Sequence, residues 1–211
     1  MESAAMQQTE VFPQTTFGCY LANRLIYAAA PVLAGVKPAV LVSLRRCGQH
    51  RWTKAAAGFC GATGLRVREL YTTPNARHVL VYDPYALSAT LRDENACEIL
   101  YHYSYPAITE LATCLAHLKA RCQGCGKGNP FPHEIGIFLG YPPADVSAFI
   151  RFSGKEYLCC NHWKVYHDEH GAREIFQRIE EAKQHARTLL SKQIPAFLAV
   201  EMLKNYFCTG G

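Results

Sequence analysis

The sequence contains no long hydrophobic run, no leader-like N-terminus, no internal repeat and no low-complexity segment. Its uninterrupted apolar stretches fall well short of the ~20 residues that a membrane-spanning helix needs, which argues against a protein built on such helices. The first 14 residues, MESAAMQQTEVFPQ, have neither a basic region nor an apolar core, so no signal peptide is expected. These absences together predict a globular protein of the cytoplasm.

The chain does contain enough apolar residues for a hydrophobic core. Hydrophobic residues make up 49% of its 211 residues, which suits one domain with an extension. We expect a disordered tail over residues 1–14, a single globular domain over 15–192 and a helical extension over 193–211. No boundary between two domains is indicated.

The net charge of +5 is unevenly distributed along the chain. Residues 11–82 carry nine basic side chains and one acidic one, and the remaining residues sum to −3. Such a basic half can attract phosphate, nucleic acid or an acidic partner, and it can equally be a solvated surface. Arg45 and Arg46 lie between an expected strand and an expected helix, where guanidinium groups and helix amides suit an anion. With Lys37 they are candidates for binding an anionic small molecule.

The pattern of apolar residues predicts an α+β fold. LRVRELY and RHVLVYD, joined by the turn TTPNA, predict a β-hairpin over about 65–83. KPAVLVSL predicts a strand over about 37–44, and KEYLCCNHWKVYH predicts another over about 155–167, with a bend near Cys160. Helical spacing predicts several α-helices that cover this small sheet, among them 93–103 with Asp93 as its N-cap and a long helix over 168–192. Pro31 is expected to end the first helix.

The ten cysteines raise the question of a metal site. Without a signal peptide they are expected to be free thiols or metal ligands, not disulfides. Cys122 and Cys125 have the Cys-x-x-Cys spacing that can chelate zinc. Cys160 and His162 could supply the other two ligands, although their spacing departs from common zinc patterns. The alternative is a loop whose thiols have no special role.

His133 and Glu134 are a candidate pair for catalysis. A His-Glu pair can do acid–base chemistry, but this one lacks the second histidine of an H-E-x-x-H site, since Ile137 stands there. Pro132 at a helix start and Glu134 near a helix N-terminus also have a purely structural explanation. Residues 134–150 resemble a helix-turn-helix in outline, yet Ala144, Asp145 and their neighbours offer nothing that reads DNA.

Several stretches resemble the family of bacterial proteins known as domain of unknown function 3793. They are FPHEIGIFLGYPPADVSAFI (131–150), APVLAGVKPAVL (30–41), HVLVYDPYAL (78–87) and HWKVYHDEHGAREIF (162–176). The resemblance implies a cytoplasmic protein of anaerobic Firmicutes with no established activity. Members often carry His-Cys where this chain has Ala28 and Ala29, which puts in doubt any chemistry resting on that pair.

Two classes of function therefore stay open. The first is a non-enzymatic ligand-binding or accessory protein whose binding face is built by residues 132–143 against the 155–167 strand, with Trp163, Lys164 and Tyr166 as further contacts. The second is a metal- or thiol-dependent enzyme that uses the Cys/His cluster. A nucleic-acid-binding regulator is a weaker third interpretation, and no membrane partner is expected.

Overall fold

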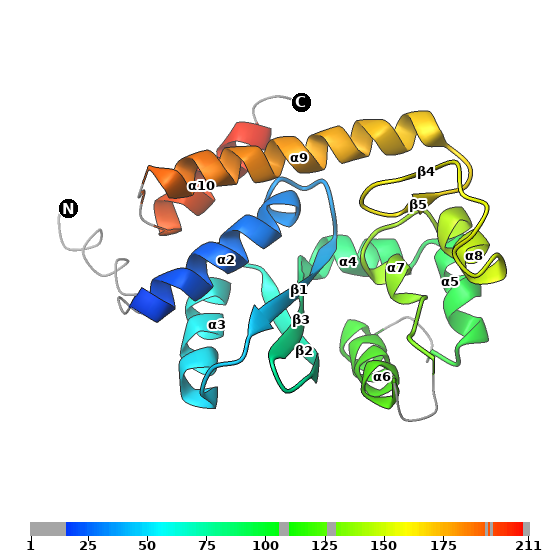
Figure 1. Ribbon diagram of the computed structural model, residues 1–211, viewed down its shortest axis with the longest axis horizontal. Helices are drawn as coiled ribbons and strands as arrows, with labels where there is room; N and C mark the ends of the chain where they lie inside the picture. Colours follow the sequence, from blue (N-terminus) through cyan, green and yellow to red (C-terminus); the bar gives the residue numbers. More distant parts are fainter. Residues whose placement is uncertain (1–15, 106–109, 126–129, 193, 195, 209–211) are drawn as a thin grey trace.

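The computed structural model describes residues 16–105, 110–125, 130–192, 194 and 196–208 (Figure 1). The tail predicted over residues 1–14 lies outside these ranges. The fold is α+β, as predicted: a three-stranded sheet and a separate two-stranded hairpin among α-helices. No helix in the described ranges is both long and apolar enough to cross a membrane.

The central sheet is antiparallel and has the order β1-β3-β2. Its strands are β1 (Ala39–Arg45), β2 (Arg66–Thr72) and β3 (Ala76–Tyr82). The turn between β2 and β3 closes on Thr73, whose backbone N–H and hydroxyl both donate to the Ala76 carbonyl. The predicted hairpin and the predicted first strand are therefore confirmed, with boundaries shifted by one or two residues.

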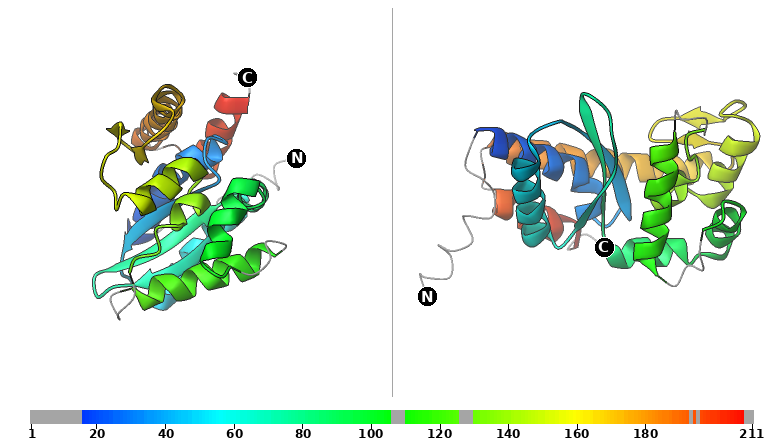
Figure 2. Two further views of the ribbon diagram at one scale, coloured as in Figure 1. Left: turned by 90° about the vertical axis from the view of Figure 1, so that its right-hand side faces the viewer. Right: turned by 90° about the horizontal axis from the view of Figure 1, so that it is seen from below.

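Both faces of this sheet are covered by helices (Figure 2). Because side chains alternate along a strand, Val42, Val79 and Val81 pack on one face, and Leu80 packs on the other. The helices on the valine side are α2 (Thr16–Leu33), α3 (Gln49–Thr63), α9 (Glu169–Ser191) and α10 (Ala196–Cys208). The helices on the leucine side are α4 (Pro84–Leu91), α5 (Glu94–His102), α6 (Leu111–Gly124), α7 (Ile135–Phe138) and α8 (Pro143–Arg151). The sheet thus forms the middle layer of the protein.

The second sheet is a small hairpin of β4 (Cys159–Cys160) and β5 (Lys164–Val165). The sequence predicts one strand over 155–167, whereas the structure has two short strands joined by a bend at residues 161–163, where the Asn161 N–H donates to the Trp163 carbonyl. The bend turns the chain back on itself, so β4 pairs with β5 and neither joins the central sheet. Trp163 and Val165 pack instead against Phe176 and Ile179 of α9.

Two proline positions differ from expectation. Pro31 lies inside α2, near its end, and the chain leaves the helix only after Leu33. There the N–H groups of Val36 and Lys37 both donate to the Pro31 carbonyl. Pro132 does not open a helix directly, because a turn precedes α7, which begins at Ile135. The predicted Asp93 cap is present, since its carboxylate accepts from the Ala96 N–H at the start of α5.

Helix α9 connects the two ends of the molecule (Figure 1). Its first half covers the β4–β5 hairpin through Ala172 and Phe176. Its second half packs on α2 and α10 through Ala182, Ala186 and Leu189. The part of the chain predicted as a C-terminal extension contains α10, which packs against α2, α3 and α9. Helix α9 therefore fixes the hairpin relative to the main core.

Candidate functional site

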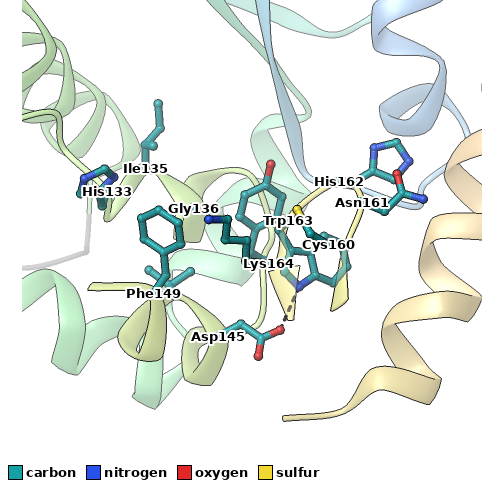
Figure 3. A pocket seen from close by; sticks show the side chains of 12 residues that line it. His133, Ile135, Gly136, Asp145, Phe149, Cys160, Asn161, His162, Trp163 and Lys164 are labelled. Carbon is teal, nitrogen blue, oxygen red and sulfur yellow. Dashed lines mark hydrogen bonds between the residues drawn. The ribbon is translucent and has the colours of Figure 1, made fainter. Parts of the chain in front are cut away.

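A cavity of about 250 Å³ lies between α7, α8 and the β4–β5 hairpin (Figure 3). Gly136 of α7 allows its neighbours to come close, since a Cβ there would lie 2.8 Å from Val146 Cγ2 of α8. The chain supplies this cavity from two segments, residues 133–149 and 160–164, which residues 150–159 connect. The lining residues are His133, Ile135, Gly136, Tyr141, Asp145, Val146, Phe149, Cys160, Asn161, His162, Trp163 and Lys164.

Three aromatic side chains form much of the cavity wall. The Tyr141 ring stacks on Trp163 with centroids 5.2 Å apart and an angle of 28° between the planes. Phe176 of α9 supports the indole edge-on at 4.5 Å. Phe149 of α8 lines the cavity as well, and the His133 ring lies 5.0 Å from it. Such walls suit a flat, largely apolar molecule.

Asp145 holds α8 to the hairpin from the side of the cavity. The residue is buried, and its Oδ2 accepts a hydrogen bond of 2.8 Å from the indole Nε1–H of Trp163. Its Oδ1 accepts from the backbone N–H of Tyr166 at 2.8 Å and lies 3.2 Å from Nδ1 of His167. Asp145 also lies in the first turn of α8, where the helix dipole favours a negative charge. Both carboxylate oxygens are therefore occupied by the protein itself.

Lys164 brings a positive charge to the cavity. Its Nζ donates to the Gly154 carbonyl at 2.6 Å, and it lies 5.8 Å from the centre of the Phe149 ring and 4.7 Å from that of Tyr157. Within the described part of the chain, no carboxylate comes within 4.0 Å of this amine. Gly154 has φ of +72°, the left-handed conformation that lets the chain turn back toward Lys164.

A second group of charges lies behind Tyr141 and His162. The Lys37 Nζ is 4.6 Å from the centre of the Tyr141 ring. Burial, with help from the nearby charge of Lys183, lowers the pKa of Lys37 to about 8. The Nε2 of His162 lies 2.9 Å from Glu180 Oε1. Burial is the main cause that lowers the pKa of His162, so this imidazole favours its neutral form.

The predicted catalytic pair divides between two environments. His133 is exposed and lines the cavity. Glu134 is fully buried and does not line the cavity. Glu134 Oε1 accepts a 3.1 Å hydrogen bond from the Tyr105 hydroxyl and pairs with Arg121 of α6. Burial, reinforced by the Glu134 charge, raises the pKa of Tyr105. The glutamate thus joins α6 to the start of α7, and among the described residues no hydrogen bond or ion pair joins its carboxylate to His133.

The four predicted metal ligands lie in two separate places. Cys122 and Cys125 line a different cavity, of about 640 Å³, together with Tyr71. Cys160 and His162 line the first cavity. Among the residues with described positions, no three His, Cys, Asp or Glu side chains are arranged to hold a metal ion. Burial, followed by the charge of Glu134, raises the pKa of Cys122 to about 12, so its thiol is protonated at neutral pH.

The remaining predicted contacts are distributed along the fold. Lys37 precedes β1, while Arg45 ends this strand and Arg46 follows it, roughly 25 Å away at the usual strand rise. Both arginines are exposed, and Arg46 reaches the Thr73 carbonyl at 3.5 Å. Trp163 and Lys164 line the cavity, whereas the Tyr166 ring lies 6.0 Å from Phe152, outside it. The structure therefore places Trp163 and Lys164 in the cavity wall and Lys37 behind Tyr141, and it leaves the arginines elsewhere.

Sequence reasoning missed Phe149 and the role of Asp145. From the sequence, Asp145 is only one of the residues that offer nothing to read DNA. A carboxylate in the first turn of a helix, with a tryptophan later in the chain as an N–H donor, is the signal that could have found this link. Nothing local in the sequence indicates that Phe149 faces the hairpin.

Comparison with known families agrees with the sequence motifs. A family model described as a protein of unknown function (DUF3793) matches residues 25–197. The matched region contains every element that lines the cavity, from α7 to β5, and the whole of α9. No curated protein and no solved structure matches the chain.

Proposed function

The chain belongs to the DUF3793 family of proteins of unknown function, and we propose that it is a non-enzymatic binding protein for a small, flat molecule. The observation that carries this proposal is the cavity between α7, α8 and the β4–β5 hairpin, with Tyr141, Trp163 and Phe149 in its walls. Its volume of about 250 Å³ lies just below the ~300–1,000 Å³ usual for ligand sites. The cavity therefore suits a compound with one ring system, not a nucleotide.

The polar groups of the cavity favour binding over catalysis. Among the lining residues, Cys160 is the candidate thiol nucleophile, and His133 and His162 are its candidate bases. A catalytic thiol needs a base within hydrogen-bond reach. Within the described ranges, no hydrogen bond joins Cys160 to either histidine, and His162 is instead paired with Glu180. Asp145 is likewise engaged in holding the hairpin.

Calorimetry with a panel of single-ring compounds tests the proposal. The panel contains phenylacetamide, phenylacetate and phenethylamine, which share one ring and differ in charge. We expect at least one of them to bind saturably, because the ring can insert beside Phe149 and Trp163. The substitution Phe149→Ala should weaken that binding roughly tenfold or more, since it removes an aromatic wall.

The matched control is Phe152→Ala. Phe152 follows the same helix, but its ring stacks on Tyr166 and does not line the cavity. This variant should bind the compounds as the unchanged protein does. Equal binding by the Phe149→Ala protein, or no binding of any compound to the unchanged protein, would contradict the proposed function.

A further inference from the structure

We propose that the ligand of this cavity is a single-ring carboxylate whose negative group is held by Lys164. The inference rests on the proposed function and adds the charge of the ligand to it. Figure 3 shows the Lys164 side chain between Phe149 and Trp163, with its amine directed toward Phe149. A ring lying against the aromatic walls would thus place a substituent beside this amine.

The first argument is that Lys164 has hydrogen-bonding capacity left. A lysine ammonium has three N–H donors, and the Gly154 carbonyl accepts from one of them at 2.6 Å. The rings of Phe149 and Tyr157 provide further favourable contacts for the charge without accepting a conventional hydrogen bond. No carboxylate of the described chain lies within 4.0 Å of Nζ. A ligand carboxylate would supply the missing counter-charge.

The second argument is that the acidic residue of the cavity does not take this role. Asp145 accepts from the Trp163 indole and the Tyr166 backbone, and it lies beside His167. Figure 3 shows its carboxylate directed toward the indole nitrogen, whereas the Lys164 amine is directed toward Phe149. Because these donors compensate its charge, the Asp145 carboxylate has no free oxygen with which to bind a cationic ligand.

The third argument is the sign of the surrounding charge. Lys37, behind the Tyr141 ring, also has no carboxylate within 4.0 Å in the described chain. Lys164 thus lines the cavity, and Lys37 lies behind one of its aromatic walls. A positive charge near a cavity attracts ligands of the opposite sign. Both lysines favour an anionic ligand over a cationic one.

The charge preference is tested by comparing phenylacetate with its neutral counterpart phenylacetamide and with phenethylamine. We expect phenylacetate to bind roughly tenfold or more tightly than phenylacetamide, because charge-assisted hydrogen bonds are about twice as strong as neutral ones. Phenethylamine should bind weakest. In Lys164→Met the preference should vanish while phenylacetamide still binds, and Lys164→Arg should restore the preference.

Lys155→Met is the matched control, since Lys155 is exposed and does not line the cavity. It should leave the preference unchanged. Equal binding of phenylacetate and phenylacetamide to the unchanged protein would overturn the carboxylate inference and leave the proposed binding function intact. The same holds if Lys164→Met keeps the preference. Failure of all three compounds to bind would instead overturn the proposed function, and the inference with it.

Discussion

Replacing Glu134 by glutamine should destabilise the fold strongly without disturbing the cavity. Glu134 is fully buried, and its Oε1 is shared by the Tyr105 hydroxyl and Arg121. Its Oε2 has no hydrogen-bond partner in the described structure. Glutamine has nearly the same shape, so the substitution removes the charge and changes little else.

The expected loss follows from the surroundings of the two partners. Breaking a buried ion pair costs ~3–5 kcal/mol. Arg121 retains 30% of its side-chain exposure, so water can solvate part of its charge and reduce that cost. Glutamine also places an amide N–H₂ where a partner is lacking, which costs ~1–3 kcal/mol. We therefore expect a loss of roughly 2–4 kcal/mol in the free energy of unfolding.

Urea denaturation measures this effect. With a slope of about 2 kcal/mol/M, the midpoint should fall by roughly 1–2 M. The control is Glu110→Gln, because Glu110 is exposed and its side chain accepts a hydrogen bond only from Thr113 among the described residues. That variant should change stability by less than ~0.5 kcal/mol. A loss below ~1 kcal/mol for Glu134→Gln would refute the view that this buried pair joins α6 to α7.

Three further predictions concern stability and metal binding. Lys37→Met should raise stability at pH 7 by roughly 2–3 kcal/mol, because Lys37 is charged in both states below its folded pKa of about 8 and burial of that charge is unfavourable. Above pH 8 the folded protein loses this proton before the unfolded chain does. The stability of the unchanged protein, measured by urea denaturation, should therefore rise toward pH 10 relative to that of the variant. Parallel curves of stability against pH for the two proteins would contradict this. Gly140→Ala should lower the free energy of unfolding by at least ~2 kcal/mol, because Gly140 has φ of +71° and a Cβ there would lie 2.4 Å from Pro38 Cδ. The control Gly61→Ala, in an open part of α3, should leave the melting temperature unchanged or raise it. Equal melting temperatures for the two variants would contradict the prediction. Elemental analysis of anaerobically purified protein should find less than about a tenth of an equivalent of metal. The reason is that the four predicted metal ligands, Cys122, Cys125, Cys160 and His162, lie in two cavities. A stoichiometric metal that is lost on substitution of the cysteines would instead support the hypothesis of a metal-dependent enzyme.

The sequence indicates local structure better than it indicates the cavity. Alternation predicts the β2–β3 hairpin, and a carboxylate before an apolar repeat predicts the Asp93 cap, because both depend on near neighbours. The 155–167 stretch has the composition of one strand, yet it folds as two, since the bend at 161–163 depends on Trp163 packing against Phe176. That contact involves a helix outside the stretch.

The candidate site was predicted in part for the same reason. His133, Trp163 and Lys164 belong to the two motifs that were expected to face each other, and all three line the cavity. Glu134 follows His133 directly, but its side chain is bound by Arg121 and Tyr105, which local reading of the sequence does not connect to it. Long-range hydrogen bonds decide which neighbours of a motif reach the cavity.

The most direct test of the account is an NMR titration that follows the two indole N–H signals of the protein. Trp163 forms the cavity wall and donates to Asp145, whereas Trp52 is buried against Arg77 in the other core. Phenylacetate should shift the Trp163 signal saturably and leave the Trp52 signal in place. No shift of the Trp163 signal, or equal shifts of both signals, would contradict binding in this cavity.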